Sequence, residues 1–97
     1  MRYTTKSRKA GYGEYLVTVT DTLNIKPTVT VKIEDYGPEN AYWCRWRIGE
    51  PVRFFKGTPN EHIDYEFDGC CGFKSKKEAI KCLQQEGAHI GDETVTD

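Results

Sequence analysis

The chain has 97 residues, of which 30% are charged and 12% are aromatic, and its formal net charge is −1. This length predicts one domain, residues 1–97, with one modest hydrophobic core. The near-neutral charge disfavours nonspecific binding to nucleic acid through the overall electrostatic field, but it leaves room for a local basic stripe.

The N-terminal part of the chain predicts an arm followed by two strands. Residues 1–11 are expected to form a mobile arm, in which Tyr3 could add a short edge strand. The arm is basic through Arg2, Lys6, Arg8 and Lys9. The stretches Tyr12–Thr20 and Thr28–Glu34 alternate β-branched and polar residues, as half-buried strands do.

The next predicted strand, Ala41–Ile48, carries the most informative pattern of the chain. Alternate side chains of a strand point to opposite faces of the sheet. One face would therefore be apolar and directed to the core, and the other would carry Trp43, Arg45 and Arg47. An exposed Trp beside two Arg is typical of a recognition surface.

Two further strands are expected before a sharp connection. The pattern breaks at Gly49-Glu50-Pro51, resumes as a short strand at Val52–Lys56, and alternates again over His62–Asp68. The sequence Gly69-Cys70-Cys71-Gly72 is expected to be a tight junction, because its glycines allow backbone angles that other residues avoid.

One helix is predicted to begin at Ser75. Ser75 and Glu78 have the spacing of a capping box, in which each side chain satisfies a backbone amide of the first turn. An apolar stripe follows, and Gly87 is expected to end the helix. The remaining residues, 88–97, are expected to form a frayed acidic tail.

These elements predict an α+β fold: an antiparallel meander of four or five strands with one C-terminal helix packed on one face, all within residues 12–86. The second face would remain in water, as antiparallel sheets allow. The sequence leaves open which face the helix covers. The side chains expected to point inward are Tyr15, Val17, Val19, Val29, Val31, Ile33, Tyr42, Cys44, Trp46, Ile48, Ile63, Tyr65 and Phe67.

The cysteines and the apolar runs bear on cofactors and compartment. The four cysteines are Cys44, Cys70, Cys71 and Cys82. Structural zinc sites usually take ligands in close pairs about two to four residues apart, and this spacing does not occur here. Buried small side chains are therefore favoured, although metal binding or a Cys44–Cys82 disulfide stays open. No apolar run suits a membrane span or a signal peptide, so we expect a cytoplasmic protein with reduced thiols.

The chain offers little for catalysis. Cys70 and Cys71 precede a helix N-terminus, which would lower the pKa of a thiol, and His62 lies one strand length away. A catalytic site would also need a pocket and an oxyanion donor. We therefore expect a protein that is not an enzyme, with no catalytic residues, no metal and no cofactor.

A resemblance to a known family lies in the segment Asp68–Glu86. Its centre, Gly72–Ala79, resembles the junction between the last strand and the helix of AP2-like domains, which include the arm-binding domains of phage integrases. The resemblance implies three strands before a capped helix, and DNA reading by Arg and Trp on the open sheet face. Trp43, Arg45 and Arg47 would take that role here.

Two functions fit these patterns. The first is a non-enzymatic binding protein, in the style of small phage accessory proteins and anti-CRISPR proteins, that occludes a protein or a protein–nucleic-acid complex. Its partner-binding residues would be Trp43, Arg45, Arg47 and Arg53, with Asp64 and Glu66 as a polar rim. The alternative is DNA or RNA binding. Its residues would be Arg2, Lys6, Arg8, Lys9, Lys32, Trp43, Arg45 and Arg47. A homodimer through the open face or an edge strand also fits the sequence.

Overall fold

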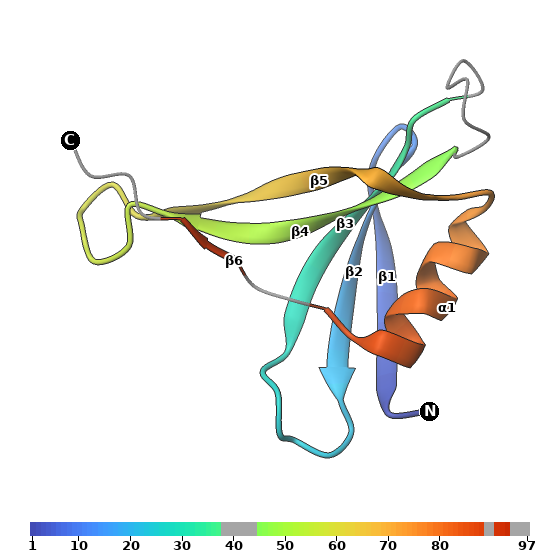
Figure 1. Cartoon of the computed structure of the whole chain (residues 1–97), viewed down its shortest axis with the longest axis horizontal. Coiled ribbons are helices and arrows are strands. Elements are labelled where there is room, and N and C mark those ends of the chain that lie inside the picture. Colours follow the sequence, from blue (N-terminus) through green and yellow to red (C-terminus); the bar gives the residue numbers. More distant parts are fainter. Residues whose placement is uncertain (38–44, 89–90, 94–97) are drawn as a thin grey trace.

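The protein has the α+β architecture predicted from its sequence. The computed structural model describes residues 1–37, 45–88 and 91–93, with side chains described for all of them except 68–71 and 91–93. Five strands form an antiparallel sheet in meander order, and one helix follows them (Figure 1). A short sixth strand pairs with the fourth. The elements are β1 Tyr3–Gly11, β2 Glu14–Asp21, β3 Val29–Asp35, β4 Trp46–Phe54, β5 His62–Phe73, α1 Lys76–Glu86 and β6 Gly91–Glu93.

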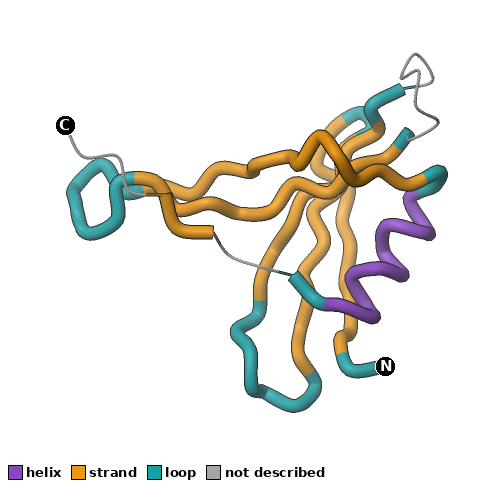
Figure 2. Tube along the Cα trace, viewed as in Figure 1, coloured by secondary structure: helices purple, strands orange, loops and turns teal. Residues whose placement is uncertain are grey.

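The core lies between α1 and one face of β1, β2 and β3. Val17, Val31 and Ile33 are fully buried there, as their alternation with polar residues predicts. Leu83 and Ala79 of the helix pack against these side chains and complete the core. Trp46, Ile48 and Phe73 are half-buried and pack at its margin. The loops lie at the ends of the strands, so the helix is the described element that covers a sheet face (Figure 2).

The prediction of a mobile arm is wrong for Tyr3–Gly11, which forms the edge strand β1. This strand pairs with β2 from Tyr3, opposite Asp21, to Gly11, opposite Glu14. Tyr3 is buried against the helix end, where its ring packs on Gly87. The basic residues show no apolar alternation that would predict a strand, because the side chains of an edge strand can remain in water on both faces of the sheet.

β4 runs through Gly49-Glu50-Pro51, where the sequence predicted a break. The strand pairs with β3 only over Trp46–Gly49, and with β6 over Val52–Phe54. Pro51 falls between these two pairings, so its missing N–H interrupts neither ladder. Beyond Gly49 the β4–β5 ribbon separates from β3 and projects away from the helix (Figure 1).

A shift of register between β4 and β5 inverts the predicted faces of β5. Arg47 pairs with Gly72, but Gly49 pairs with Phe67, so that Ile48 stands opposite residues 68–71. The predicted tight junction Gly69–Gly72 is thus part of a strand. When one strand carries extra residues opposite a single residue of its partner, the side chains beyond them in that strand can change to the other face of the sheet. Three side chains predicted to point inward lie instead on the face away from the helix: Ile63, Tyr65 and Phe67.

The helix begins and ends where the sequence predicts. The Ser75 side chain accepts a hydrogen bond from the Glu78 N–H at 3.2 Å. Glu78 in turn accepts one from the Lys74 N–H at 3.2 Å, and the two bonds satisfy amides that have no partner inside the helix. Gly87 ends the helix with φ 78° and donates its N–H to Leu83 O. This helix is too short to cross a membrane.

The tail differs from the frayed segment that was predicted. Ala88 packs against the core, and Gly91–Glu93 forms β6 beside β4. β6 runs parallel to β4, on the edge that β4 exposes after β3 has separated from it. The C-terminal segment therefore supplies backbone partners that β4 would otherwise lack.

Replacing Ser75 with Ala should lower the free energy of unfolding by about 1 kcal/mol, because the Glu78 amide loses its cap. Urea unfolding followed by circular dichroism measures the change. Lys77→Ala, on the exposed side of the same turn, is the control and should have little effect. Unchanged stability of Ser75→Ala would contradict a helix that begins at this residue.

Replacing Gly87 with Ala should destabilise the protein more than replacing Gly57 with Ala. Both glycines have a positive φ, 78° at Gly87 and 80° at Gly57, and the ψ of −168° at Gly87 adds a backbone conformation that side chains avoid. An added Cβ would lie 2.7 Å from the Tyr3 ring at Gly87, but would meet nothing within 4 Å at Gly57. Thermal unfolding of both variants measures the difference, and equal losses of stability would contradict a tight contact between Gly87 and Tyr3.

Candidate partner-binding surface on the open sheet face

The face of the sheet opposite the helix carries a cluster of aromatic and charged side chains. Cross-strand pairing places Glu14, Glu34 and Arg47 in one row on this open face. A second row runs through Lys32, Gly49 and Phe67. We call the following residues the open-face cluster: Glu14, Lys32, Glu34, Tyr36, Arg47, Tyr65 and Phe67.

Arg47 lies at the centre of the open-face cluster. Its Nε donates to Glu34 Oε2 at 2.7 Å. Its guanidinium carbon lies 4.2 Å from the ring centroid of Tyr36 and 4.4 Å from that of Phe67. A planar cation between two rings combines cation–π attraction with apolar contact. The Arg47 side chain keeps 29% of its surface exposed, so a partner can still reach it.

Gly49 makes room for this arrangement. A Cβ added at Gly49 would lie 2.6 Å from the ring of Phe67. Glycine in the interior of a strand is otherwise unfavourable and often marks a close approach of another group. In the sequence, the same glycine within Gly49-Glu50-Pro51 predicts a break between two strands, and the structure has one continuous strand there.

Lys32 forms the second charged centre of the cluster. Its Nζ lies 3.7 Å from Glu14 Oε2 and 5.8 Å from the ring centroid of Tyr65. Next to it, the hydroxyls of Thr18 and Thr30 are 3.2 Å apart and form a cross-strand hydrogen bond. The surface around Lys32 is thus polar, half-buried and already paired within the sheet.

The other predicted contact arginines are also paired with carboxylates. Arg45 binds Asp35 through two hydrogen bonds, of 3.0 Å and 3.1 Å. These bonds, together with one from the Gly37 N–H, hold the pKa of Asp35 below its usual value. Arg53 lies 3.4 Å from Glu61. Each cation therefore has an acidic neighbour, and these pairs carry little net charge.

The predicted polar rim lies elsewhere. Asp64 and Glu66 alternate with Tyr65 and Phe67 along β5, so they face the helix-bearing side of the sheet with Glu50. The Asp64 carboxylate accepts the Tyr65 N–H at 2.8 Å. They cannot rim the open face, because the register shift reversed the faces of β5. Trp43 lies outside the described residues.

The basic residues of β1 divide into two groups. Lys6 and Arg8 pair with Thr18 and Leu16, which places them on the open face beside the cluster. Lys9 lies on the other face. All three are exposed and make no ion pair within the described part of the chain. Arg2, in contrast, is engaged by Asp21.

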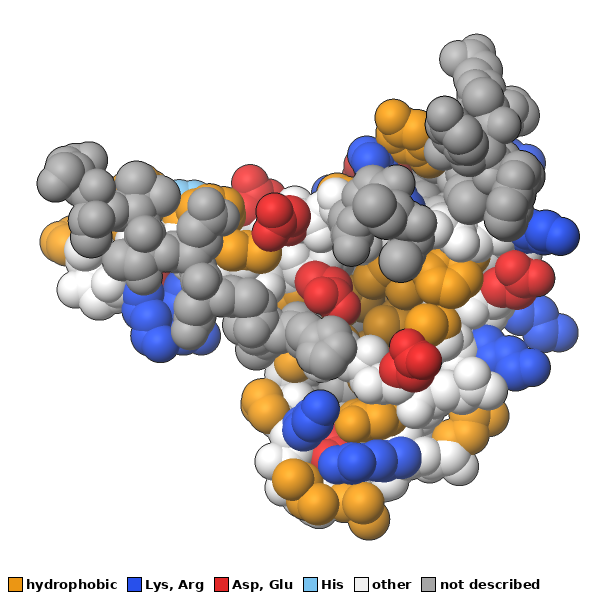
Figure 3. Space-filling model, in the orientation of Figure 1, with side chains coloured by type: hydrophobic (Ala, Val, Ile, Leu, Met, Phe, Trp, Pro, Cys, Tyr) orange, Lys and Arg blue, Asp and Glu red, His pale blue; other side chains and the backbone are white. Residues whose placement is uncertain are grey.

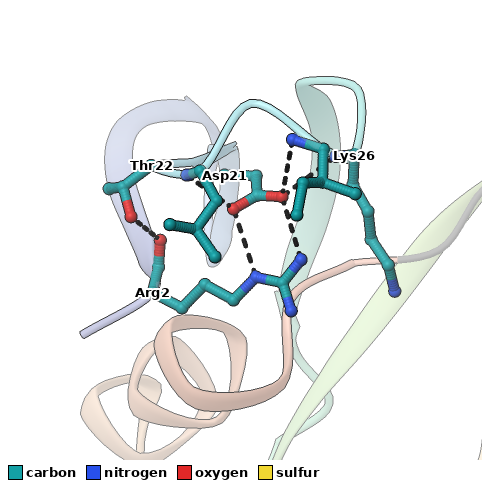
Figure 4. Close-up of polar contacts among 6 residues, drawn as sticks. Arg2, Asp21, Thr22 and Lys26 are labelled. Carbon is teal, nitrogen blue, oxygen red and sulfur yellow. Dashed lines mark hydrogen bonds and ion pairs between the residues drawn. The ribbon is translucent and has the colours of Figure 1, made fainter.

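Asp21 is a buried carboxylate that organises the loop after β2 (Figure 4). It is 2% exposed. It accepts two hydrogen bonds from Arg2, both of 3.2 Å, and one from the Lys26 N–H at 2.9 Å. The Leu23 and Ile25 amides donate to it as well. The Arg2 bonds foremost, and then the amides, hold the pKa of Asp21 well below its usual value.

The same loop displays two aliphatic side chains to water. Leu23 is 60% exposed and Ile25 is 72% exposed. In Figure 3 apolar side chains gather at this end of the molecule, with basic side chains next to them. This surface lies at the end of the sheet and is separate from the open-face cluster.

The described cysteine and acidic side chains do not form a metal centre. Cys82 is half-buried on the helix, and its Sγ donates to Glu86 Oε2 at 3.7 Å. The side chains of Cys44, Cys70 and Cys71 lie outside the described ones. Among described residues, no group of three or more His, Cys, Asp or Glu side chains is placed to hold a metal ion.

Comparison with known proteins yields no match: no protein-family model matches the chain, and neither does any curated protein or any solved structure. The resemblance to AP2-like domains therefore stays a prediction. The geometry defines the class of protein instead: an α+β protein whose helix covers one face of the sheet, with a charged and aromatic cluster on the other.

Replacing Asp21 with Asn should flatten the dependence of stability on pH. An unfolded Asp has a pKa of about 3.9, and the folded value is lower. The carboxylate therefore stabilises the fold fully above that pH, and this stabilisation is lost as the pH falls towards the folded pKa.

The measurement is urea unfolding of both proteins from about pH 2 to about pH 6. We expect the native chain to lose more stability on acidification than Asp21→Asn does. At neutral pH the variant should have the lower free energy of unfolding. Some slope should remain in the variant, because the pKa of Asp35 is also lowered. Equal slopes in the two proteins would contradict the role of Asp21.

Proposed function

We propose that this protein is a non-enzymatic binding protein, of the accessory or inhibitory kind, that covers a partner protein or a protein–nucleic-acid complex with its open sheet face. The observation that carries the proposal is the position of Arg47 between Tyr36 and Phe67, with Glu34 as its ion-pair partner. Arginine and aromatic side chains are the residues enriched at the centres of protein interfaces.

The cluster suits binding because its side chains are already ordered. The side chains of Arg47, Glu34 and Lys32 each retain between 25% and 29% of their surface, so they are held by neighbours and yet accessible. Immobilising a flexible side chain on binding costs about 0.5–1.5 kcal/mol. Side chains that the fold already restrains lose less of this conformational freedom.

The charge balance of the cluster favours protein over nucleic acid. Within the cluster, Lys32 and Arg47 are each within 3.7 Å of a carboxylate, from Glu14 and Glu34 respectively. Outside the cluster, Arg45 is paired with Asp35 in the same way. A phosphate that approached these cations would meet the carboxylates as well, and binding to a polyanion depends on unbalanced positive charge. A protein surface with its own mixture of apolar and polar groups meets no such penalty.

Nucleic-acid binding remains the second candidate, because Lys6, Arg8 and Lys9 have no carboxylate partner within the described residues. These cations lie along β1, with Lys6 and Arg8 beside the cluster and Lys9 on the other face. The two candidates differ in their response to salt: phosphate binding weakens steeply as the salt concentration rises, and a largely apolar protein contact changes little.

The test is a pull-down from bacterial lysate with a tagged chain, with and without nuclease, compared between Ile63→Ala and Ile25→Ala. Both isoleucines are exposed, by 56% and 72%, so neither change should unfold the protein. Ile63 lies on the open face and Ile25 lies on the loop after β2. We expect Ile63→Ala to weaken retention of the partner about tenfold or more, with Ile25→Ala unchanged.

Arg47→Lys provides a second variant, which keeps the charge but loses the planar contact with both rings. Arg47→Lys should weaken the retention of the same partner, and its melting curve checks that the variant is folded. Loss of binding in Ile25→Ala alone would move the contact to the loop. Retention that disappears with nuclease and falls steeply with salt would favour the nucleic-acid candidate instead.

A further inference from the structure

The outer edge of β1 is an open hydrogen-bonding edge. In the described sheet β1 pairs only with β2. The Thr22 N–H donates to Arg2 O at 2.9 Å, at the start of this pairing. Hydrogen-bonded pairs alternate with non-bonded pairs along an antiparallel ladder. Thr4, Lys6 and Arg8 therefore direct their backbone groups to β2, and Thr5, Ser7 and Lys9 direct theirs outward.

The middle of this edge is accessible. The helix lies beside the N-terminal half of β1, where Gln84 donates to the Thr5 hydroxyl at 3.0 Å and Gly87 packs on Tyr3. From Lys6 to Ala10 every residue is exposed. The backbone groups of Ser7 and Lys9 are thus open to a further strand, which would bind them as the next strand of a sheet does.

The charge of the edge identifies the chemistry of that strand. Lys6 and Arg8 project from one face of β1 and Lys9 from the other, and β1 contains no acidic residue. None of the three makes an ion pair within the described residues. Opposite charges on directly opposed residues stabilise a strand pair, and like charges destabilise it. Acidic residues two positions apart would face Lys6 and Arg8.

A second copy of the chain fits the edge poorly. If two β1 strands paired antiparallel about a two-fold axis centred on Ser7, Lys6 of each copy would stand opposite Arg8 of the other. Centring the axis on Lys6 or Arg8 would instead oppose that residue with itself. Each arrangement sets like charges together.

We propose that the edge of β1 binds an extended acidic segment of a partner protein by strand addition, through the backbone groups of Ser7 and Lys9 and the charges of Lys6 and Arg8. This inference rests on the proposed function for its choice of a protein partner, and it names a second contact beside the open-face cluster. The partner would lie across the cluster and contribute one strand to the sheet.

The experiment uses a short acetylated peptide of alternating glutamate and valine, titrated to millimolar concentration into the ¹⁵N-labelled full chain. We expect chemical-shift changes along β1 and slower hydrogen exchange of the Ser7 and Lys9 amides. The matched peptide of alternating lysine and valine should not bind. The double variant Lys6→Glu/Arg8→Glu should reverse this preference.

Ser7→Pro tests the backbone contact, with Ser7→Ala as its control. The Ser7 N–H does not bond β2, and an edge strand tolerates proline when its N–H faces outward. Ser7→Pro should therefore fold and lose affinity for the glutamate peptide about tenfold or more, and Ser7→Ala should bind as the native chain does.

Three results would overturn the inference. Equal binding by Ser7→Pro and Ser7→Ala would reduce the contact to charge alone. An absence of shift changes at millimolar peptide would exclude an acidic strand on this edge. Protection of the Ser7 and Lys9 amides that grows with protein concentration, without peptide, would make a second copy the occupant.

The same variants separate this inference from the proposed function. A pull-down partner that is lost by Ile63→Ala and retained by Ser7→Pro would leave the open-face proposal intact and remove the edge contact. If the glutamate peptide binds at β1 but Ile63→Ala loses no partner in the pull-down, the edge contact would stand and the open-face proposal would be removed.

Discussion

The shift of register between β4 and β5 determines which side chains each face of the sheet presents. Ile48 stands opposite residues 68–71, and the strand resumes with Phe67 beside Gly49. With regular alternation from Phe73, Phe67 would point to the core. The shift turns Phe67 and Tyr65 to the face away from the helix, where they meet Arg47 and Lys32. The two β5 rings therefore belong to the open-face cluster because of this irregularity.

A second constraint is the division of β4 between two partners. β4 pairs with β3 at Trp46–Gly49 and with β6 at Val52–Phe54. The short contact with β3 lets the β4–β5 ribbon leave the three-stranded part that holds the core (Figure 1). The C-terminal strand then satisfies backbone groups of β4 that β3 no longer reaches.

Charge pairing divides the surface into a balanced part and an unbalanced part. On the open face, Glu14 and Glu34 each hold a cation, and Asp35 holds Arg45 nearby, so these ion pairs contribute little net field. Exposed or half-exposed ion pairs of this kind contribute little to stability, but they determine what the surface can bind. Along β1 the cations have no such neighbours within the described residues, so the positive potential is concentrated at the sheet edge.

The sequence alone determined the elements whose signals are local. The alternation of Val17 and Val19, and of Val29, Val31 and Ile33, predicted two strands and the buried side of each. Ser75 and Gly87 predicted both ends of the helix, because capping depends on residues within a turn of each other. The α+β class and the meander order followed from these elements.

Only the tertiary structure decided which residues form the open-face cluster and the basic edge. The faces of β5 depend on how many residues oppose Ile48, and alternation within one strand carries no information about its partner's register. The strand nature of β1 depends on its pairing with β2 and on the contact of Tyr3 with Gly87, which is distant in sequence. Pairing between strands is non-local, so patterns within each strand predicted Arg47 as a contact residue but not the rings that hold it.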